Sequence, residues 1–328
     1  MYFVKLKTRT FALVVSAKIR LPLVLLLATC GFSLPASADG CPGADAKALE
    51  WIGKMSDSAH QQSYHGVVTR ERGSDLQVMR ITRSIGENSS FESLTHLTGQ
   101  SAKVERSGHP LDCVHPGHKV LALGANLEAG SCEITQHYRF RMASNERVAG
   151  RDAVRVRVEP RDMYRYGYQL SLDAQTGLLL KTVVVSTKKR ALEKFQFANV
   201  SFQSQADSLV EVDVSHTAGH PDPNGAGSDL LAPLPWNVTW VPDGFVATDS
   251  ATGRASRRTY TDGLAVFSVF LEYIDGEIPP GEGLVRNGGT TSYTKGLTLD
   301  GHALLVTVIG EVPVYTVRMV AESIRWAN

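Results

Sequence analysis

Four side chains that can bind a transition metal fall within ten residues of one another in the segment GHPLDCVHPGHK. They are His109, Cys113, His115 and His118. Thiolate and imidazole are the ligands that zinc prefers, usually four of them in a tetrahedral site. Two prolines and a glycine make the spacing irregular, and Cys113 has a second use as a disulfide partner. We therefore interpret the segment as a polar loop and predict no metal site.

A second candidate is the row of tyrosines at Tyr164, Tyr166 and Tyr168 in the segment MYRYGYQLSLD. Alternate residues of a β-strand point to the same face of a sheet, so the three rings would form one aromatic stripe. Such a stripe could line a cavity that binds an apolar ligand. The alternative is ordinary core packing, which aromatic side chains commonly provide.

Catalytic motifs are missing from the whole sequence. It contains no G-x-S-x-G, H-E-x-x-H, G-x-x-x-x-G-K-[ST] or C-x-x-C. These patterns mark common hydrolase, zinc-protease, nucleotide-binding and redox sites. Their absence removes these common kinds of site but does not by itself exclude an enzyme.

The amino terminus has the features of a secretory signal peptide. Five basic residues precede the apolar run Leu21–Phe32, and the small-residue segment Ala36–Ala38 follows. We predict a signal peptide over 1–38 and export to the periplasm. A membrane anchor and a lipoprotein signal at Cys30 are the alternatives, but the apolar run is shorter than the roughly 20 residues that cross a bilayer.

Removal of this leader leaves 29 basic and 33 acidic residues in the mature chain. A nucleic-acid-binding protein would have a strong basic excess, so no nucleic-acid partner is predicted. Three cysteines remain: Cys41, Cys113 and Cys132. In an oxidising compartment we expect Cys113 and Cys132 to form a disulfide. Cys41 would then be a free thiol or form an intermolecular bridge.

The elements that must position these residues fall into two groups. A helix near residues 44–62 has an apolar face, and residues 64–202 alternate like the strands of one strongly curved antiparallel sheet. A segment rich in Gly, Pro and Asp follows. We predict a first domain over 39–202, a linker over 203–235 and a small second domain over 236–328.

The second domain has its own signals for hairpins and a helix. Asp262–Gly263 predicts a hairpin with a type I′ turn, and Asp300–Gly301 predicts another. Pro313 is expected to begin a helix whose apolar face covers the sheet. The face is predicted to contain Val317, Val320, Ala321 and Ile324.

The two halves together resemble the MucB/RseB family of regulators of the envelope-stress (sigma-E type) sigma factor. The resemblance rests on the following segments: RDMYRYGYQLSLDAQTGLLLK at 161–181 with FQFANVSF, TWVPDGF at 239–245, YTDGLAVFSV at 260–269, and GEVPVYTVRMVAESI at 310–324. It covers nearly the whole mature chain. Residues 99–133, which contain two of the cysteines, depart from the family pattern.

The resemblance implies an α+β protein. Its first domain would be a half-open antiparallel β-barrel with helices on the concave side, like the lipoprotein carriers. Its second would be a small α/β sandwich. The implied function involves no catalysis and no cofactor, so the chain is not expected to be an enzyme. It would bind the periplasmic part of a transmembrane anti-sigma factor and protect it from regulated proteolysis.

Lipid, lipopolysaccharide or lipoprotein acyl chains would release this partner, with the tyrosine row as the lipid site. We predict Phe245, Tyr260 and Phe267 as partner contacts, because they lie in the segments that carry the resemblance. Core packing is their alternative. The rival function is a periplasmic lipid or lipoprotein carrier without a regulatory partner. The sequence leaves homo-oligomerisation open.

Overall fold

The computed structural model describes residue 41 and residues 43–86, 89–110, 132–202, 236–248, 256–274, 282–299 and 301–326. All of these belong to one compact unit, Asp39–Asn328. The predicted signal peptide, 1–38, and the predicted linker, 203–235, lie outside the described residues, so the proposed domain boundaries stay predictions. Within the described ranges, no helix is both long and apolar enough to cross a membrane.

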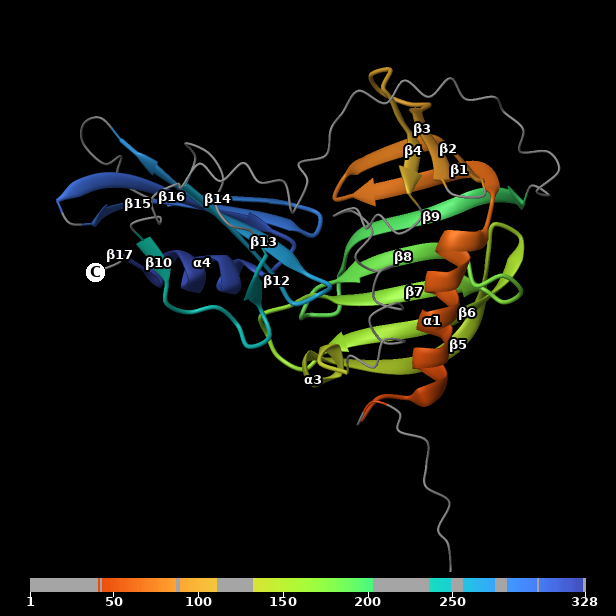
Figure 1. Ribbon diagram of the computed structural model, residues 1–328, viewed down its shortest axis with the longest axis horizontal. Coiled ribbons are helices and arrows are strands. Elements are labelled where there is room, and N and C mark those ends of the chain that lie inside the picture. Colours follow the sequence, from red (N-terminus) through yellow and green to blue (C-terminus); the bar gives the residue numbers. More distant parts are fainter. Residues whose placement is uncertain are drawn as a thin grey trace, which may run out of the picture. The chain divides into compact units, whose positions relative to one another are not determined.

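The first sheet has nine strands in the described part of the chain, in the order β4-β3-β2-β1-β9-β8-β7-β6-β5 (Figure 1). Their bounds are β1 Tyr64–Arg72, β2 Asp75–Ile85, β3 Ser89–His96, β4 Lys103–Pro110, β5 Tyr138–Val148, β6 Arg151–Pro160, β7 Gly167–Asp173, β8 Leu179–Val185 and β9 Ala191–Phe202. Every neighbouring pair is antiparallel. The edge strands β4 and β5 do not pair with each other, so the sheet stays half-open, as expected.

Alternating hydrophobicity explains how these strands choose their faces. In β6 the side chains of Val154, Val156 and Val158 are buried, whereas Arg157 between them is exposed. One position needs glycine because of a close approach between strands. A Cβ at Gly66 would overlap the carbonyl oxygen of Asn199, beside an irregularity in the pairing of β1 with β9. Glycine at this position thus permits the close approach of β1 to β9.

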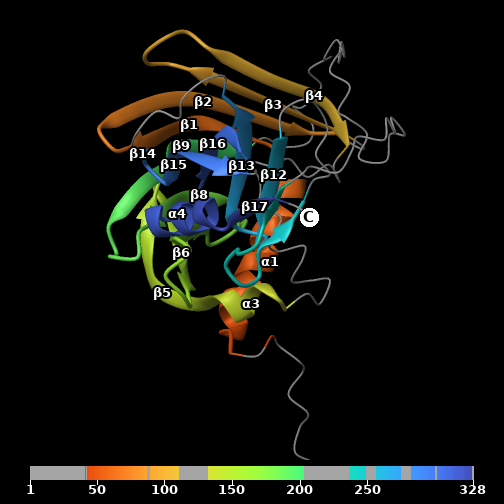
Figure 2. The same ribbon diagram turned by 90° about the vertical axis from the view of Figure 1, so that its left-hand side faces the viewer.

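Helix α1, Ala46–Gln61, lies against this sheet, which curves around it (Figure 2). The carboxylate of Asp45 caps the helix by accepting hydrogen bonds from the backbone N–H groups of Lys47 and Ala48. The buried face of α1 packs with residues of β5, β6 and β7 in one apolar cluster, which includes Ala48, Ile52, Met55, Phe140, Val156, Val158, Tyr168 and Leu170. The predicted helix and its apolar face are therefore confirmed.

The second sheet has six strands among the described residues, in the order β11-β12-β13-β16-β15-β14. Their bounds are β11 Val246–Ala247, β12 Ser256–Thr261, β13 Val266–Tyr273, β14 Glu282–Asn287, β15 Thr290–Leu299 and β16 His302–Gly310. Helix α4, Val314–Glu322, packs on it, and β10, Trp236–Val238, pairs with β17, Ile324–Trp326. The predicted class, a large antiparallel sheet followed by a smaller sheet domain with its own helix, is correct.

Two local predictions in this part are wrong. Ile324 is buried, but it belongs to β17 and not to the helix. The hydroxyl and the N–H of Ser323 both donate to the carbonyl of Val320, which ends α4 and lets the chain turn to pair with β10. The hairpin at Asp262 exists, but residues 262–265 form its loop and only Gly263 has a positive φ, so it is not a two-residue type I′ turn.

Candidate functional site

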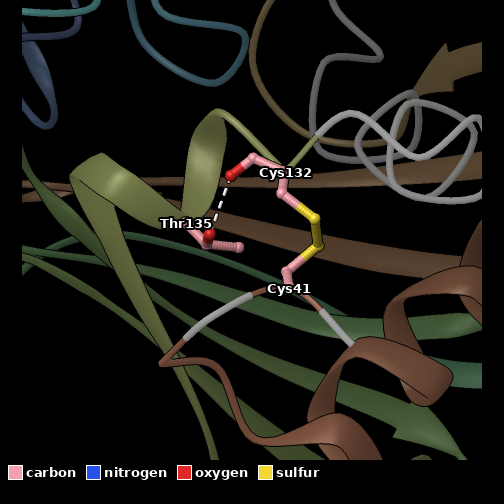
Figure 3. Close-up of a disulfide and its surroundings, with 3 residues drawn as sticks. All are labelled: Cys41, Cys132 and Thr135. Carbon is pink, nitrogen blue, oxygen red and sulfur yellow. Dashed lines mark hydrogen bonds between the residues drawn. A yellow bond between two sulfur atoms is a disulfide. The ribbon is translucent and has the colours of Figure 1, made fainter. Parts of the chain in front are cut away.

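Cys132 forms a disulfide with Cys41, and the predicted pair of Cys113 with Cys132 is therefore wrong (Figure 3). The two Cα atoms are 5.2 Å apart although 91 residues separate them in the sequence. The segment just before α1 and the segment just before α3, Ile134–His137, therefore meet in space. The sequence favours Cys113 as the partner of Cys132 only because the two are closer along the chain. Cys41 is consequently not free.

Most of the histidine-rich segment lies outside the described residues. Cys113, His115 and His118 lie outside the described residues, and so does the side chain of His109 in β4. The described residues contain no group of three or more His, Cys, Asp or Glu side chains that could hold a metal ion. The interpretation of this segment as a polar loop stays a prediction.

The tyrosine row is divided between two environments. Tyr168 lies in β7 and is buried against the apolar face of α1, and this burial raises the pKa of its phenol well above the usual value. Tyr164 and Tyr166 precede β7, which begins at Gly167, so the three rings do not share one strand face. The expected aromatic stripe is absent from this described segment, and a role of the three in lipid binding stays a prediction.

The other two tyrosines contact the second sheet domain. The ring of Tyr164 stacks on Tyr315 of α4 with ring centroids 5.9 Å apart, and it meets Trp240 edge-on at 5.3 Å. The hydroxyl of Tyr166 lies 3.4 Å from the hydroxyl of Thr291 in β15. The loop between β6 and β7 is therefore part of a junction between the two sheets.

A fully buried arginine in the same loop forms the centre of this junction. Nε of Arg165 donates to a carboxylate oxygen of Asp262 at 2.7 Å, and both side chains have no exposed surface. The remaining nitrogens of the guanidinium donate to the carboxylate of Asp162 and to the carbonyl of Asp243. The guanidinium also lies over the ring of Phe245, 5.1 Å from its centroid. A buried cation is thus balanced by one carboxylate from each sheet domain.

Both carboxylate oxygens of Asp262 accept hydrogen bonds. One accepts hydrogen bonds from the backbone N–H groups of Leu264 and Ala265, at 2.9 and 2.7 Å. The other accepts from Arg165 and from the hydroxyl of Tyr138, which lies 3.0 Å away. Burial, and then the negative charge of Asp262, raise the pKa of Tyr138 well above the usual value, so this hydroxyl remains a donor. We call the set Arg165, Asp262, Tyr138 and Asp162 the junction cluster.

Sequence reasoning missed the junction cluster. Arg165 stands between two tyrosines of the predicted lipid site, and for Asp262 the sequence predicts only a position in a turn. The available signal was weak. Both residues lie within segments that carry the family resemblance, but nothing local shows that an arginine will be fully buried.

A cavity of about 470 Å³ lies beside the same loop, at the ends of β6, β7 and β8. Its lining combines two cations, Arg157 and Lys189, with the apolar side chains of Met163 and Val185. The full lining is Arg157, Val158, Glu159, Pro160, Asp162, Met163, Gly167, Tyr168, Gln169, Val185, Ser186, Thr187 and Lys189. Of the three predicted lipid-site tyrosines, only Tyr168 borders it.

The three predicted partner contacts are all buried in the core of the second sheet domain. Phe267 is packed between Phe245 and Tyr260, with ring centroids 5.1 and 5.2 Å away. Their burial assigns these side chains to packing, which was the alternative for each of them. A direct contact with a partner stays a prediction.

Comparisons with known proteins agree over both sheets. Residues 47–216 match the model of the MucB/RseB N-terminal domain, and residues 231–325 match that of the MucB/RseB C-terminal domain. The sigma factor AlgU regulatory protein MucB of Pseudomonas aeruginosa is 31% identical over 293 residues, which cover 85% of this chain and 91% of the relative. The sigma-E factor regulatory protein RseB of Haemophilus influenzae is 22% identical, with 86% and 92% covered.

Solved structures give the same result. The complex structure of Pseudomonas aeruginosa MucA/MucB has a chain that is 31% identical, covers 86% of this chain and 100% of its own length, and superimposes with a TM-score of 0.67. A crystal structure of MucB has a TM-score of 0.56 at 30% identity, with 86% and 98% covered. Since a family model spans more than half of the residues and a relative above 30% identity covers most of the chain, this protein belongs to the MucB/RseB family.

Proposed function

We propose that this protein is a non-catalytic periplasmic regulator that binds the periplasmic part of a transmembrane anti-sigma factor and protects it from regulated proteolysis. The observation that carries the proposal is the likeness, over 86% of the chain, to MucB solved as a complex with MucA. The names of the relatives, regulatory proteins of sigma factors, point in the same direction.

The junction cluster suggests how such a protein can have two states. Arg165 comes from the first sheet domain and Asp262 from the second, so any change in docking must separate or rearrange a buried ion pair. Separating the pair without a substitute would leave unpaired buried charges, which is strongly unfavourable. Two discrete arrangements, each with its charges paired or solvated, are therefore more stable than intermediate ones, as a switch requires.

We further propose that an acyl chain with an anionic head group, as in lipopolysaccharide, binds in the cavity beside β6 and β7. The cavity volume of about 470 Å³ lies within the usual range for small-molecule sites. Met163 and Val185 offer apolar surface to the chain. Lys189 offers positive charge to phosphate, whereas Arg157 already pairs with Glu159 at 3.5 Å. Each buried methylene contributes about 0.8 kcal/mol.

The cavity and the junction share a residue, which gives the two events a physical link. Asp162 lines the cavity and also accepts a hydrogen bond from Arg165. A ligand that moves Asp162 changes the balance of charge around Arg165. Binding of the lipid and of the anti-sigma segment must then affect each other reciprocally, because coupling between two sites acts equally in both directions.

A periplasmic lipid or lipoprotein carrier without a regulatory partner is the second candidate. It is favoured by one observation, that every residue lining the cavity belongs to the first sheet domain. The carrier hypothesis assigns no task to the second sheet domain. The two hypotheses therefore differ in whether a membrane partner exists.

Retention of membrane proteins on the immobilised mature protein, residues 39–328, separates the two hypotheses. Detergent-solubilised inner-membrane proteins are passed over it and the retained material is identified by mass spectrometry. The regulator should retain one single-span anti-sigma factor. Retention of no such protein, together with binding of lipid, would favour the carrier.

The lipid site is tested by displacement of a fluorescent fatty acid with lipopolysaccharide. Met163→Glu places a negative charge in the cavity and should weaken binding at least about tenfold, since an unpaired charge opposes burial of the chain. Leu76→Glu is the matched control, because Leu76 is equally exposed, 55% against 54% for Met163, and does not line the cavity. Equal effects of the two variants would refute this site.

A further inference from the structure

We propose that the Cys41–Cys132 disulfide is a redox-sensitive clamp. In its oxidised form it fixes α3 against the second sheet domain, and its reduction weakens the junction between the two sheets. The contacts on either side of α3 carry this inference.

Helix α3 depends on its neighbours for its position. It has only four residues, and its N-cap residue Glu133 makes no side-chain capping bond. The hydroxyl of Thr135 donates to the carbonyl of Cys132 at 2.7 Å (Figure 3). Its backbone N–H donates to the same carbonyl at 3.0 Å. A helix of this length is unstable by itself in water. The location of α3 therefore follows the location of Cys132, which the disulfide ties to Cys41, five residues before the start of α1.

The other side of α3 contacts the second sheet domain. Ile134 shares an apolar cluster with Leu264, which comes from the loop between β12 and β13. The ring of His137 occupies the space that any side chain at Gly244 would need. Tyr138, directly after the helix, donates its hydroxyl to Asp262. Displacement of α3 would consequently disturb an apolar contact, a steric fit and a buried hydrogen bond together.

Arg161 joins the disulfide segment to the junction cluster. Its guanidinium donates to the carbonyl of Thr135 at 2.9 Å and to the carbonyl of Gly43 at 3.5 Å. Its backbone N–H donates to the carbonyl of His137 at 2.9 Å. The same loop continues to Arg165. The residues next to Cys41, the short helix and the loop with the buried arginine thus form one connected set.

The clamp can be opened by thiol–disulfide exchange with a dithiol. A thiolate of the dithiol attacks one sulfur of the pair, forms a mixed disulfide and releases the other cysteine as a thiol. The second thiol of the reductant then releases the remaining cysteine. The two cysteines gain two electrons and two protons, and the dithiol becomes a disulfide. Cys132 is half-buried, whereas Cys41 is only 9% exposed, so Cys132 is the more exposed residue of the pair.

Hydrogen exchange measured by mass spectrometry tests the clamp on the mature chain, residues 39–328, in a Cys113→Ser background that leaves one pair of cysteines. The oxidised protein is compared with protein treated with dithiothreitol, with thiol titration to confirm two free cysteines. We expect exchange to rise at least about tenfold in segments 132–138 and 262–265, because the closed state that protects them is destabilised. Segment 304–309 of β16 should not change.

The outcomes that overturn the proposal are distinct. No change in segments 132–138 and 262–265 after confirmed reduction would show that the disulfide does not hold the junction. A uniform rise that includes segment 304–309 would show that the bond only stabilises the whole fold. Failure of dithiothreitol to reduce the native protein would refute redox sensitivity. The variant Cys41→Ser with Cys132→Ser should match the reduced protein with and without dithiothreitol, and a difference between them would also count against the clamp.

One consequence rests on the proposed function. If the junction contributes to binding of an anti-sigma segment, reduction of the disulfide should weaken that binding at least about tenfold. Unchanged binding with increased exchange would leave the clamp intact and refute its link to the partner. Absence of binding by the oxidised protein would refute the proposed function without affecting the exchange result.

Discussion

Replacement of the buried arginine in the junction cluster, Arg165→Met, is expected to destabilise the protein strongly. Removal of one partner from a buried ion pair costs about 3–5 kcal/mol, because the other charge is left uncompensated. Asp262 would keep three hydrogen-bond donors: the N–H groups of Leu264 and Ala265 and the hydroxyl of Tyr138. These donors partly stabilise the remaining carboxylate, so we expect the lower end, about 3 kcal/mol.

Urea unfolding followed by circular dichroism measures this cost. The matched control is Arg147→Met, because Arg147 also pairs with an aspartate, Asp152, but both side chains are largely exposed, at 74% and 87%. An exposed pair of this kind contributes less than about 1 kcal/mol. Similar urea midpoints of unfolding for the two variants would show that the buried pair contributes no more to stability than the exposed pair.

A double variant isolates the interaction itself. Asp262→Asn removes the negative charge but keeps an oxygen that can accept from the N–H groups of Leu264 and Ala265. Combined with Arg165→Met, it leaves no unpaired charge from this pair, so the double variant should be more stable than the sum of the single changes predicts, by about 1–2 kcal/mol. Strict additivity would refute the coupling between the two residues.

Three further predictions concern other parts of the chain. Ile324→Asp should unfold the second sheet domain at a cost of several kcal/mol, because Ile324 is 2% exposed and its new charge would have no partner; a thermal melt showing native stability would contradict this. Gly66→Ala should destabilise the first sheet by about 1–3 kcal/mol, since its Cβ would overlap the carbonyl of Asn199, and urea unfolding measures the loss. Burial alone would raise the pKa of Glu193, but hydrogen bonds from Arg70 and Arg72 outweigh it and hold the pKa below its usual 4.5. Because the folded pKa is the lower one, this stabilisation is complete above the unfolded pKa and is lost as the pH falls through the folded value. Glu193→Gln should remove that part of the acid dependence, and an unchanged stability profile below pH 4.5 would contradict the assignment.

The regular parts of the fold were predictable because their signals are local. In β6, the alternation of Val154, Val156 and Val158 with polar residues indicates which side chains are buried. The apolar face of α4 does the same for the helix. Short turns between strands require antiparallel neighbours, so the order from β5 to β9 follows from the chain itself. The segment rich in Gly, Pro and Asp predicted the division into two domains, and the resemblance to the MucB/RseB family added the half-open form of the first sheet.

The junction and the disulfide could not be predicted because each joins distant segments. Cys41 and Cys132 are 91 positions apart, and Arg165 and Asp262 are 97 apart. Spacing in the sequence favours Cys113 as the partner of Cys132, and nothing close to Arg165 in the sequence indicates that its side chain is buried. Ile324 was assigned correctly to the core but wrongly to the helix, since Ser323 ends α4 one residue earlier. Burial is a local signal, whereas pairing is a property of the folded chain.

A protease time course tests the central claim most directly. The purified periplasmic segment of the anti-sigma factor is incubated with the protease that degrades it, with and without the mature protein, and the intact segment is measured over time. We expect the protein to slow cleavage, lipopolysaccharide to restore it, and Met163→Glu to keep the protection while losing sensitivity to lipopolysaccharide. Cleavage at the same rate with and without a folded mature protein would contradict the account.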